Sequence, residues 1–178
     1  MPTEVIINGE RFEEQFSPQF IDGCVGAVAR RLNTDYAHKN PILLVVLNGS
    51  FMYAADLVRR LNFPHELQFI KLASYEGMES TGDVKTLIGL DPKKLRDRDI
   101  IIVEDIVDTG KTLNNLMPVL KDARSVEITS AVFKRDKLEI CLNIKYPAIT
   151  IPGDPFILGY GMDYDGAGRN LGSIYYHV

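Results

Sequence analysis

The sequence predicts an α/β protein with a mainly parallel, twisted sheet flanked by helices. Residues 42–47 and 100–103 are apolar at every position, which is typical of strands buried on both faces at the centre of a parallel sheet. Segments with apolar residues at helical spacing separate the expected strands. Because strands that alternate with helices form βαβ units, we expect the sheet to be parallel.

Each expected element has its own signal. Ser17 and Pro18 supply a hydroxyl N-cap and a proline at the first helical position, and apolar residues recur at helical spacing to about Asn33. A helix that opens at Thr112 contains Pro118, which limits its length. The other expected elements are a strand at 42–47, a helix from about 52 to 61, strands at 66–73, 100–103 and 126–133, and short apolar pieces after residue 146.

Length and composition fit one folded domain, residues 1–178. Of the 178 residues, 46% are hydrophobic and 25% are charged, as in average soluble proteins. Cys24 and Cys141 lie far apart in the sequence, and we expect both to be reduced core residues of a cytoplasmic protein. No N-terminal signal pattern is present, and no apolar run approaches the ~20 residues that span a bilayer.

The formal net charge is -4, from 20 Lys and Arg against 24 Asp and Glu. This balance argues against a protein that coats nucleic acid or an anionic membrane, and we expect neither as a partner. A small anionic ligand remains compatible with it, because a few oriented donors can hold a phosphate in an acidic protein.

Three polar segments, 48–50, 104–112 and 134–135, each follow an expected strand. Ligands of parallel sheets bind beyond the carboxyl ends of the strands, so these segments are expected to share one face. Residues 104–112 are the most informative, because two adjacent carboxylates precede a glycine-bearing turn and the start of a helix. Backbone N–H groups at a helix N-terminus attract anions, which makes this turn a candidate phosphate cradle.

The triplet Gly110-Lys111-Thr112 alone suggests the phosphate loop of a nucleoside triphosphatase. That motif requires glycine at position 105, where this chain has Asp105, and a carboxylate there would repel the triphosphate. A sugar phosphate fits better, since carboxylates accept hydrogen bonds from vicinal hydroxyls while N–H groups hold the phosphate.

The segment 103–112, Val-Glu-Asp-Ile-Val-Asp-Thr-Gly-Lys-Thr, resembles the phosphoribosyl-pyrophosphate (PRPP) motif of the type I phosphoribosyltransferases, and in particular of their hypoxanthine-guanine branch. Four further segments match this family in order, and the resemblance covers nearly the whole chain. They are Leu47 to Ser50, Ser74-Tyr75 with 80–83, Lys134-Arg135, and Gly159-Tyr160 with Asp163, Tyr164 and Arg169.

The resemblance implies the type I phosphoribosyltransferase fold, with a small hood built from the N- and C-terminal segments. It also implies purine salvage: transfer of the 5-phosphoribosyl group of PRPP to hypoxanthine or guanine, giving IMP or GMP and pyrophosphate, with Mg²⁺ as cofactor. It further implies a homo-oligomer, either a dimer or a tetramer.

The resemblance assigns roles to residues that match the family's motifs. Asp108 is the expected catalytic group, facing N7 of the purine. The donor PRPP and its phosphates are expected to contact Glu104, Asp105, Asp108, Thr109, Gly110, Lys111, Thr112, Asn48, Gly49 and Arg169.

For the purine, the resemblance implies that Lys134 donates to the exocyclic O6, Phe156 stacks on the ring, and the backbone at Ile157 reads its edge. Asp163 completes the expected purine-binding set. The expected metal-binding residues are Glu104, Asp105 and Asp163. Ser74 and Tyr75 are expected to belong to a lid.

One departure from the family concerns the expected pyrophosphate loop, where Asn48 stands in place of the usual lysine and removes a positive charge. Another is the small tripeptide at 166–168 before Arg169. Two alternatives accompany the main interpretation. A nucleic-acid-binding regulator on the same fold would need a basic face, and a relative that prefers xanthine remains open.

Overall fold

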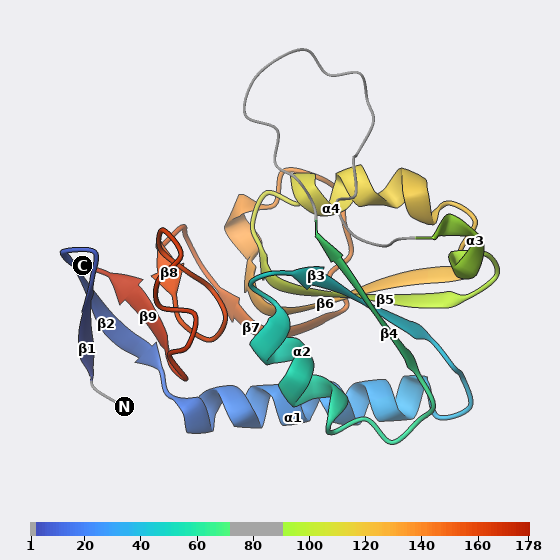
Figure 1. The fold of residues 1–178 in the computed structure, drawn as a ribbon, viewed down its shortest axis with the longest axis horizontal. Helices are drawn as coiled ribbons and strands as arrows, with labels where there is room; N and C mark the ends of the chain where they lie inside the picture. The colour runs from blue at the N-terminus through green and yellow to red at the C-terminus, as the bar shows by residue number, and fades with distance from the viewer. Residues whose placement is uncertain (1–2, 72–90) are drawn as a thin grey trace, which may run out of the picture.

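The computed structural model describes residues 3–71 and 91–178; the predicted lid residues Ser74 and Tyr75 lie outside these ranges. Five parallel strands form the main sheet, in the spatial order β4-β3-β5-β6-β7 (Figure 1). The predicted α/β class with a parallel sheet is confirmed. The strands are β3 (Ile42–Leu47), β4 (Glu66–Lys71), β5 (Asp99–Val107), β6 (Ser125–Lys134) and β7 (Tyr146–Ile151).

Helices cover both faces of this sheet. On one face, α1 (Pro18–Asp35) and α2 (Phe51–Val58) pack with Leu43 and Val45 of β3 in one core cluster. On the other face, α3 (Pro92–Leu95) and α4 (Lys111–Leu116) pack with Leu44 in a second cluster. The alternation follows from the two-residue period of a strand, and it explains why β3 and β5 need apolar residues at successive positions.

The helix boundaries follow local hydrogen bonds. Ser17 Oγ accepts from the backbone N of Phe20 at 3.3 Å, as expected of an N-cap. The helix α2 ends at Val58, earlier than predicted. The reason is the side chain of Asn33, which donates to Arg60 O and accepts from Asn62 N, both at 2.9 Å, so it holds the chain in a non-helical path.

The proline in the fourth helix has the predicted effect. The helix α4 ends at Leu116, and a 3₁₀-helix, η1 (Met117–Leu120), follows with Pro118 in its first turn. Proline lacks the N–H that an α-helix interior requires. A further short 3₁₀-helix, η2 (Arg135–Lys137), follows β6 at the sheet edge.

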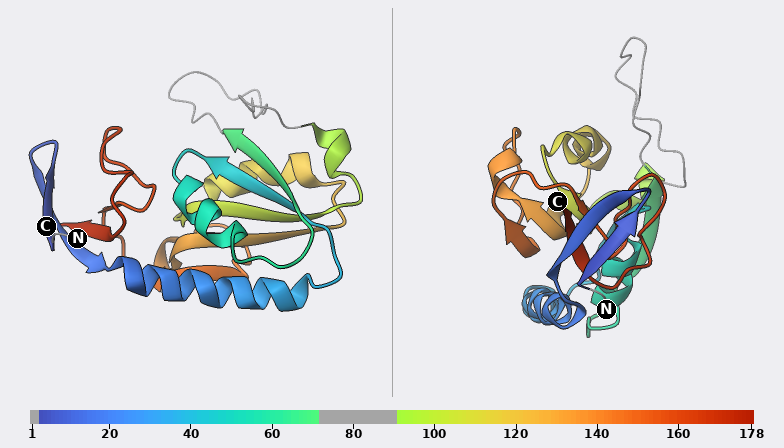
Figure 2. Two further views of the ribbon diagram at one scale, coloured as in Figure 1. Left: turned by 60° about the horizontal axis from the view of Figure 1, so that its bottom comes forward. Right: turned by 90° about the vertical axis from the view of Figure 1, so that its left-hand side faces the viewer.

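A second, antiparallel sheet forms the hood, at the N-terminal end of α1 (Figure 2). Its order is β1-β2-β9-β8, so it joins the two ends of the chain as the resemblance implied. The turn between β1 and β2 consists of Asn8 and Gly9, both at positive φ (52° and 86°), as a two-residue hairpin requires. The hood strands are β1 (Glu4–Ile7), β2 (Glu10–Phe16), β8 (Ile157–Leu158) and β9 (Ile174–His177).

The two cysteines differ in their surroundings. Cys24 is partly buried against the core, whereas Cys141 is exposed, so the prediction of a core position was wrong for Cys141. Both thiols are free. Within residues 3–71 and 91–178, no helix is long and apolar enough to cross a membrane.

The packing predicts a large difference between two leucines on adjacent strands. Leu44 of β3 is 0% exposed and Leu67 of edge strand β4 is 41% exposed. We expect Leu44→Ala to lower the free energy of unfolding by about 2–5 kcal/mol, because it leaves a cavity in the sheet's core. Leu67→Ala, the matched control, should cost less than about 1 kcal/mol. Urea titration measures both, and equal losses would contradict the assignment of β3 to the interior of the sheet.

Candidate active site

The loops predicted to share one face do so, because all five strands of the main sheet are parallel. One boundary differs from the prediction. Glu104 to Ile106 lie within β5, which pairs with β6 as far as Val107, and not in the loop that follows the strand. Glu104 and Asp105 therefore lie in the last part of β5, at the carboxyl end of the sheet. Only 108–110 remain as the connection to α4.

Glu104 is a buried carboxyl group at this edge. The residue is only 7% exposed, and no group among residues 3–71 and 91–178 forms a hydrogen bond with its Oε2. Burial, and secondly the neighbouring charge of Asp105, raise the pKa of Glu104 well above its ordinary value of 4.5. Such an orphaned polar atom in a native fold indicates a place for a ligand or an ion.

Asp105 touches the backbone of the loop that follows β3. A Cβ atom on Gly49 would overlap Asp105 Oδ2, so a side chain at this position would have to displace the Asp105 carboxylate. The other carboxylate oxygen, Oδ1, accepts from Ile106 N at 2.7 Å. The peptide bond between Leu47 and Asn48 is cis, and Asn48 itself is exposed. Asp105 and Gly49 are therefore brought together, as predicted.

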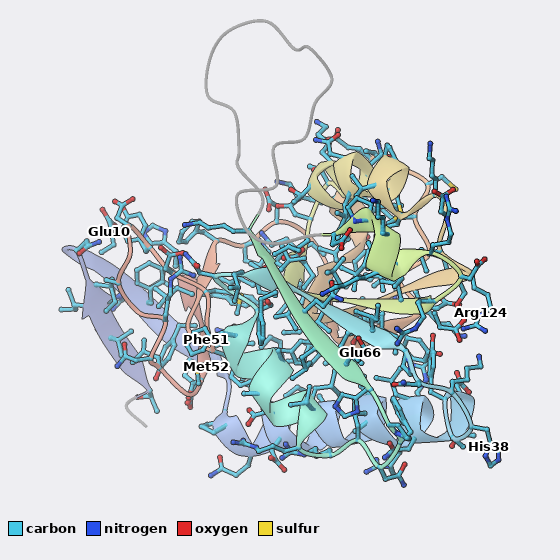
Figure 3. The ribbon with its side chains drawn as sticks, turned by 45° about the vertical axis from the view of Figure 1, so that its right-hand side comes forward. Glu10, His38, Phe51, Met52, Glu66 and Arg124 are labelled. Atoms are coloured by element: carbon cyan, nitrogen blue, oxygen red, sulfur yellow. The ribbon has the colours of Figure 1, made fainter. Side chains whose placement is uncertain are left out.

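The hood reaches the same loop through Gly161. A Cβ on Gly161 would overlap Gly49 O and would lie 3.7 Å from the Cβ of Met52, labelled at the start of α2 in Figure 3. Arg169 donates to Gly161 O at 2.9 Å and pairs with Asp163 Oδ1 at 2.7 Å. These contacts fix the guanidinium of Arg169 beside the loop at Gly49, although the tripeptide before it is small.

Asp108 and Lys134 face each other at the ends of β5 and β6. Lys134 Nζ lies 3.7 Å from Asp108 Oδ2 and 2.9 Å from Asp154 Oδ1. Lys137 Nζ lies 3.6 Å from the same Asp108 oxygen and 2.5 Å from Asp154 Oδ2. In the described part of the chain, Asp108 Oδ1 is buried without a hydrogen-bond partner. One carboxylate oxygen thus faces two ammonium groups and the other stays unpaired.

Phe156 directly precedes β8 of the hood and is half exposed (49%). Tyr164 packs edge-on against it, at 5.5 Å between ring centroids, and Phe12 of β2 lies 6.2 Å away. The following residue, Ile157, is buried at the start of β8. A phenylalanine that is supported from behind and open in front offers a stacking surface for a flat ligand.

The turn before α4 has the geometry of a cradle. Gly110 has φ +82°, and a Cβ there would come within 3.0 Å of Leu138. The first turn of any helix has N–H groups without intrahelical acceptors. Thr109 Oγ1 accepts from Lys111 N at 3.4 Å, and Lys111 Nζ pairs with Glu139 at 2.6 Å, so this lysine is turned outward. Thr112 is exposed.

The predicted metal-binding carboxylates do not form a preassembled cage. In residues 3–71 and 91–178, no group of three or more potential ligands clusters tightly enough to hold a metal ion. Asp163 is engaged by Arg169 and by Gly166 N, which donates to its Oδ2 at 2.7 Å. Mg²⁺ in enzymes often uses one or two carboxylates plus substrate phosphates, and the orphaned oxygen of Glu104 beside Asp105 fits that mode.

Comparison with known proteins shows the family of this chain. The phosphoribosyl transferase domain family matches residues 15–165. The chain belongs to this family. A hypoxanthine phosphoribosyltransferase of Buchnera aphidicola subsp. Schizaphis graminum is 42% identical over 137 residues, which are 75% of this chain and 76% of that protein.

A hypoxanthine-guanine phosphoribosyltransferase of Streptococcus pneumoniae is 36% identical over 143 residues, 79% of each chain. The crystal structure of a hypoxanthine phosphoribosyltransferase from Staphylococcus aureus superposes with a TM-score of 0.84 at 30% identity, covering 93% of this chain and 91% of that one. These likenesses confirm the predicted phosphoribosyltransferase fold.

Sequence reasoning missed two residues that contact the predicted phosphoribosyltransferase site. Lys137 follows Lys134 by three positions, in the η2 turn, and this spacing was an available signal. Asp154 precedes Phe156 by two positions, but its pairing with both lysines crosses from one loop to another. Nothing in the linear pattern indicates that contact.

The close packing at Gly49 predicts that a side chain here displaces the carboxylate of Asp105. We expect Gly49→Ala to lower phosphoribosyl transfer about a hundredfold, because the added methyl group displaces Asp105 or the loop. Gly23→Ala, in an exposed and open part of α1, is the control and should keep full activity. Enzyme assays of both variants measure this, and an active Gly49→Ala enzyme would contradict the close approach.

The raised pKa of Glu104 predicts a pH-dependent stability. The folded state favours the protonated carboxyl, so the contribution of Glu104 is favourable at low pH and is lost as pH rises through its raised pKa. We therefore expect Glu104→Gln to stabilise the fold by about 1–3 kcal/mol at pH 7 and by much less at pH 4.5. Urea unfolding at both pH values measures this. The control, exposed Glu139→Gln, should show no such pH-dependent gain.

Proposed function

We propose that this protein is a purine-salvage transferase that moves the 5-phosphoribosyl group of PRPP onto hypoxanthine or guanine, forming IMP or GMP and releasing pyrophosphate. The observation that carries this proposal is the pair Asp108 and Lys134, a carboxylate and an ammonium 3.7 Å apart at the carboxyl edge of the sheet. A 6-oxopurine presents a proton at N7 and a carbonyl at C6, which match these two groups.

In this reaction the bond between C1′ and the pyrophosphate oxygen breaks, and a bond between C1′ and the purine N9 forms. Asp108 Oδ1, which has no partner in the described part of the chain, accepts the proton that leaves N7. Lys134 donates to O6 and so disfavours a 6-aminopurine, which offers a donor there instead of an acceptor. Phe156 stacks on the ring, with the backbone at Ile157 along its edge and Asp163 nearby.

The donor lies over the loops at 48–49 and 108–112. Gly49 and Asn48 present backbone donors to the pyrophosphate, and Arg169 neutralises it as its charge develops. The turn from Asp108 to Thr112 holds the 5′-phosphate. Glu104 and Asp105 would hold Mg²⁺, which would supply charge stabilisation for the departing pyrophosphate. The lid role of Ser74 and Tyr75 remains part of the proposal and concerns residues outside the described ranges.

We also propose that the chain forms a single domain over residues 1–178 and assembles with copies of itself, in the cytoplasm. Exposed apolar side chains support assembly: Phe51 begins α2 (Figure 3), and Leu67 and Phe69 lie on edge strand β4 with 41% and 46% exposure. Two apolar side chains on the edge strand of a sheet favour a protein contact over solvent.

The deciding experiment incubates the protein with PRPP, Mg²⁺ and one purine base at a time, with nucleotide formation followed by chromatography. We expect IMP from hypoxanthine, GMP from guanine, and far less product from adenine, because Lys134 meets a donor on the amino group. Xanthine is included to test whether the protein prefers this third 6-oxopurine. No turnover of either hypoxanthine or guanine would contradict the proposal.

The role of Asp108 can be separated from donor binding. We expect Asp108→Asn to reduce kcat about 10²–10⁴-fold, because an amide cannot accept the N7 proton. Binding of PRPP with Mg²⁺, measured by calorimetry, should stay within a few-fold of wild type. An Asp108→Asn enzyme with unchanged kcat would remove the proposed proton acceptor.

A further inference from the structure

Asp108, Lys134, Asp154 and Lys137 form a closed ring of alternating charge. Each ammonium faces both carboxylates: Lys134 at 3.7 and 2.9 Å, and Lys137 at 3.6 and 2.5 Å. The ring joins three places in the fold, namely the end of β5, the turn after β6 and the connection from β7 to β8. The proposed function uses only Asp108 and Lys134.

We propose that Asp154 is a positioning residue, which acts through Lys134 and sets the enzyme's selectivity for 6-oxopurines. This inference rests on the proposed function, since it assigns a cause to the placement of the ammonium that meets O6. Lys137 holds Asp154 in place from the other side through its 2.5 Å contact with Oδ2.

The distances explain why Asp154 is needed. The 2.9 Å contact to Asp154 is a hydrogen bond, whereas the 3.7 Å separation from Asp108 is too long to be one. The side chain of Lys134 is only 7% exposed, so its ammonium needs a close partner. Without Asp154, the partner at hand is Asp108. Lys134 would then close the gap to Asp108, and the carboxylate that accepts the N7 proton would become engaged.

Asp154 also links the two lysines to Phe156, the residue proposed to stack on the purine. It lies two residues before Phe156, in a connection that is held to the η2 turn by a second carboxylate. Asp136 Oδ2 accepts from Gly153 N at 3.0 Å, and Asp136 is not one of the four residues in the ring of alternating charge. The connection that carries Phe156 is therefore held at two points. Asp154 pairs with the ammonium of Lys134, and Asp136 accepts a hydrogen bond from the backbone of Gly153.

The contacts between Asp154 and Lys137 are expected to contribute little to the free energy of unfolding. The side chain of Asp154 is 49% exposed and that of Lys137 is 35% exposed, and ion pairs of this kind contribute little to folding. A purely structural pair therefore predicts small and unselective effects on removal. A positioning role predicts a loss confined to the purine, at nearly unchanged stability.

The experiment compares wild type, Asp154→Asn, Asp154→Glu and Asp136→Asn in steady-state assays with hypoxanthine and PRPP. For Asp154→Asn we expect kcat/KM for hypoxanthine to fall about tenfold to a hundredfold, with most of the change in KM for the base. The KM for PRPP and the Tm should stay near wild type. Asp154→Glu should recover part of the loss. Asp136→Asn should lose less than about threefold, because Asp136 holds the connection through a backbone N–H and not through either lysine.

A second readout uses product binding and needs no turnover. Calorimetry with IMP and AMP should show a smaller preference for IMP in Asp154→Asn than in wild type, because Lys134 no longer meets O6. Wild-type kinetics for Asp154→Asn, or an equal loss in Asp136→Asn, would overturn the inference. A wild-type protein that does not convert hypoxanthine or guanine would instead overturn the proposed function, so the two failures are distinguishable.

Discussion

The pairing of β3 with β5 is the constraint on which the site depends. Residues 42–45 pair in register with 100–103, and these eight positions are fully buried. The hydrophobic surface removed from water there fixes how far each strand extends beyond its neighbour. Because the strands are parallel, the loop at Asn48 and Gly49 must then emerge beside Glu104 and Asp105. A shift in this register would separate the loop from the carboxylates.

This arrangement places polar groups where burial is costly. In the described part of the chain, three buried side-chain atoms have no hydrogen-bond partner: Glu104 Oε2, Asp108 Oδ1 and Ser130 Oγ. Ser130 lies directly opposite Glu104 on the neighbouring strand β6. An unsatisfied buried group costs free energy, so two orphaned carboxylates at one sheet edge indicate a fold that gives up stability for binding.

The sequence predicts the main sheet well because local composition determines it. The runs at 42–47 and 100–103 can be buried only at a sheet's centre, and Pro118 ends α4 where proline chemistry requires. The hairpin at Asn8-Gly9 was missed although this dipeptide is a recognised turn signal. Its flanking strand β2, with five charged or amide residues in seven, lacks a clear alternation of apolar and polar positions.

Other features depend on contacts that no local pattern contains. The early end of α2 follows from the side chain of Asn33 on a different helix, and the ring at Asp154 joins residues 20 positions apart. The site residues themselves were predicted from motifs, and the structure brings Gly49, Asp105, Asp108 and Lys134 to one edge.

The distribution of charge over the site separates its two halves. The ring around Lys134 contains two carboxylates and two ammonium groups, so it is neutral as a unit and suits a purine, which carries no charge. The half that would bind pyrophosphate lacks two positive charges that could neutralise it, because Asn48 is uncharged and Lys111 is paired with Glu139. Under the proposed function, Arg169, backbone N–H groups and Mg²⁺ contribute to balancing the anion. It follows that donor binding in this protein should depend more steeply on Mg²⁺ and on Arg169 than in relatives that carry a lysine at position 48.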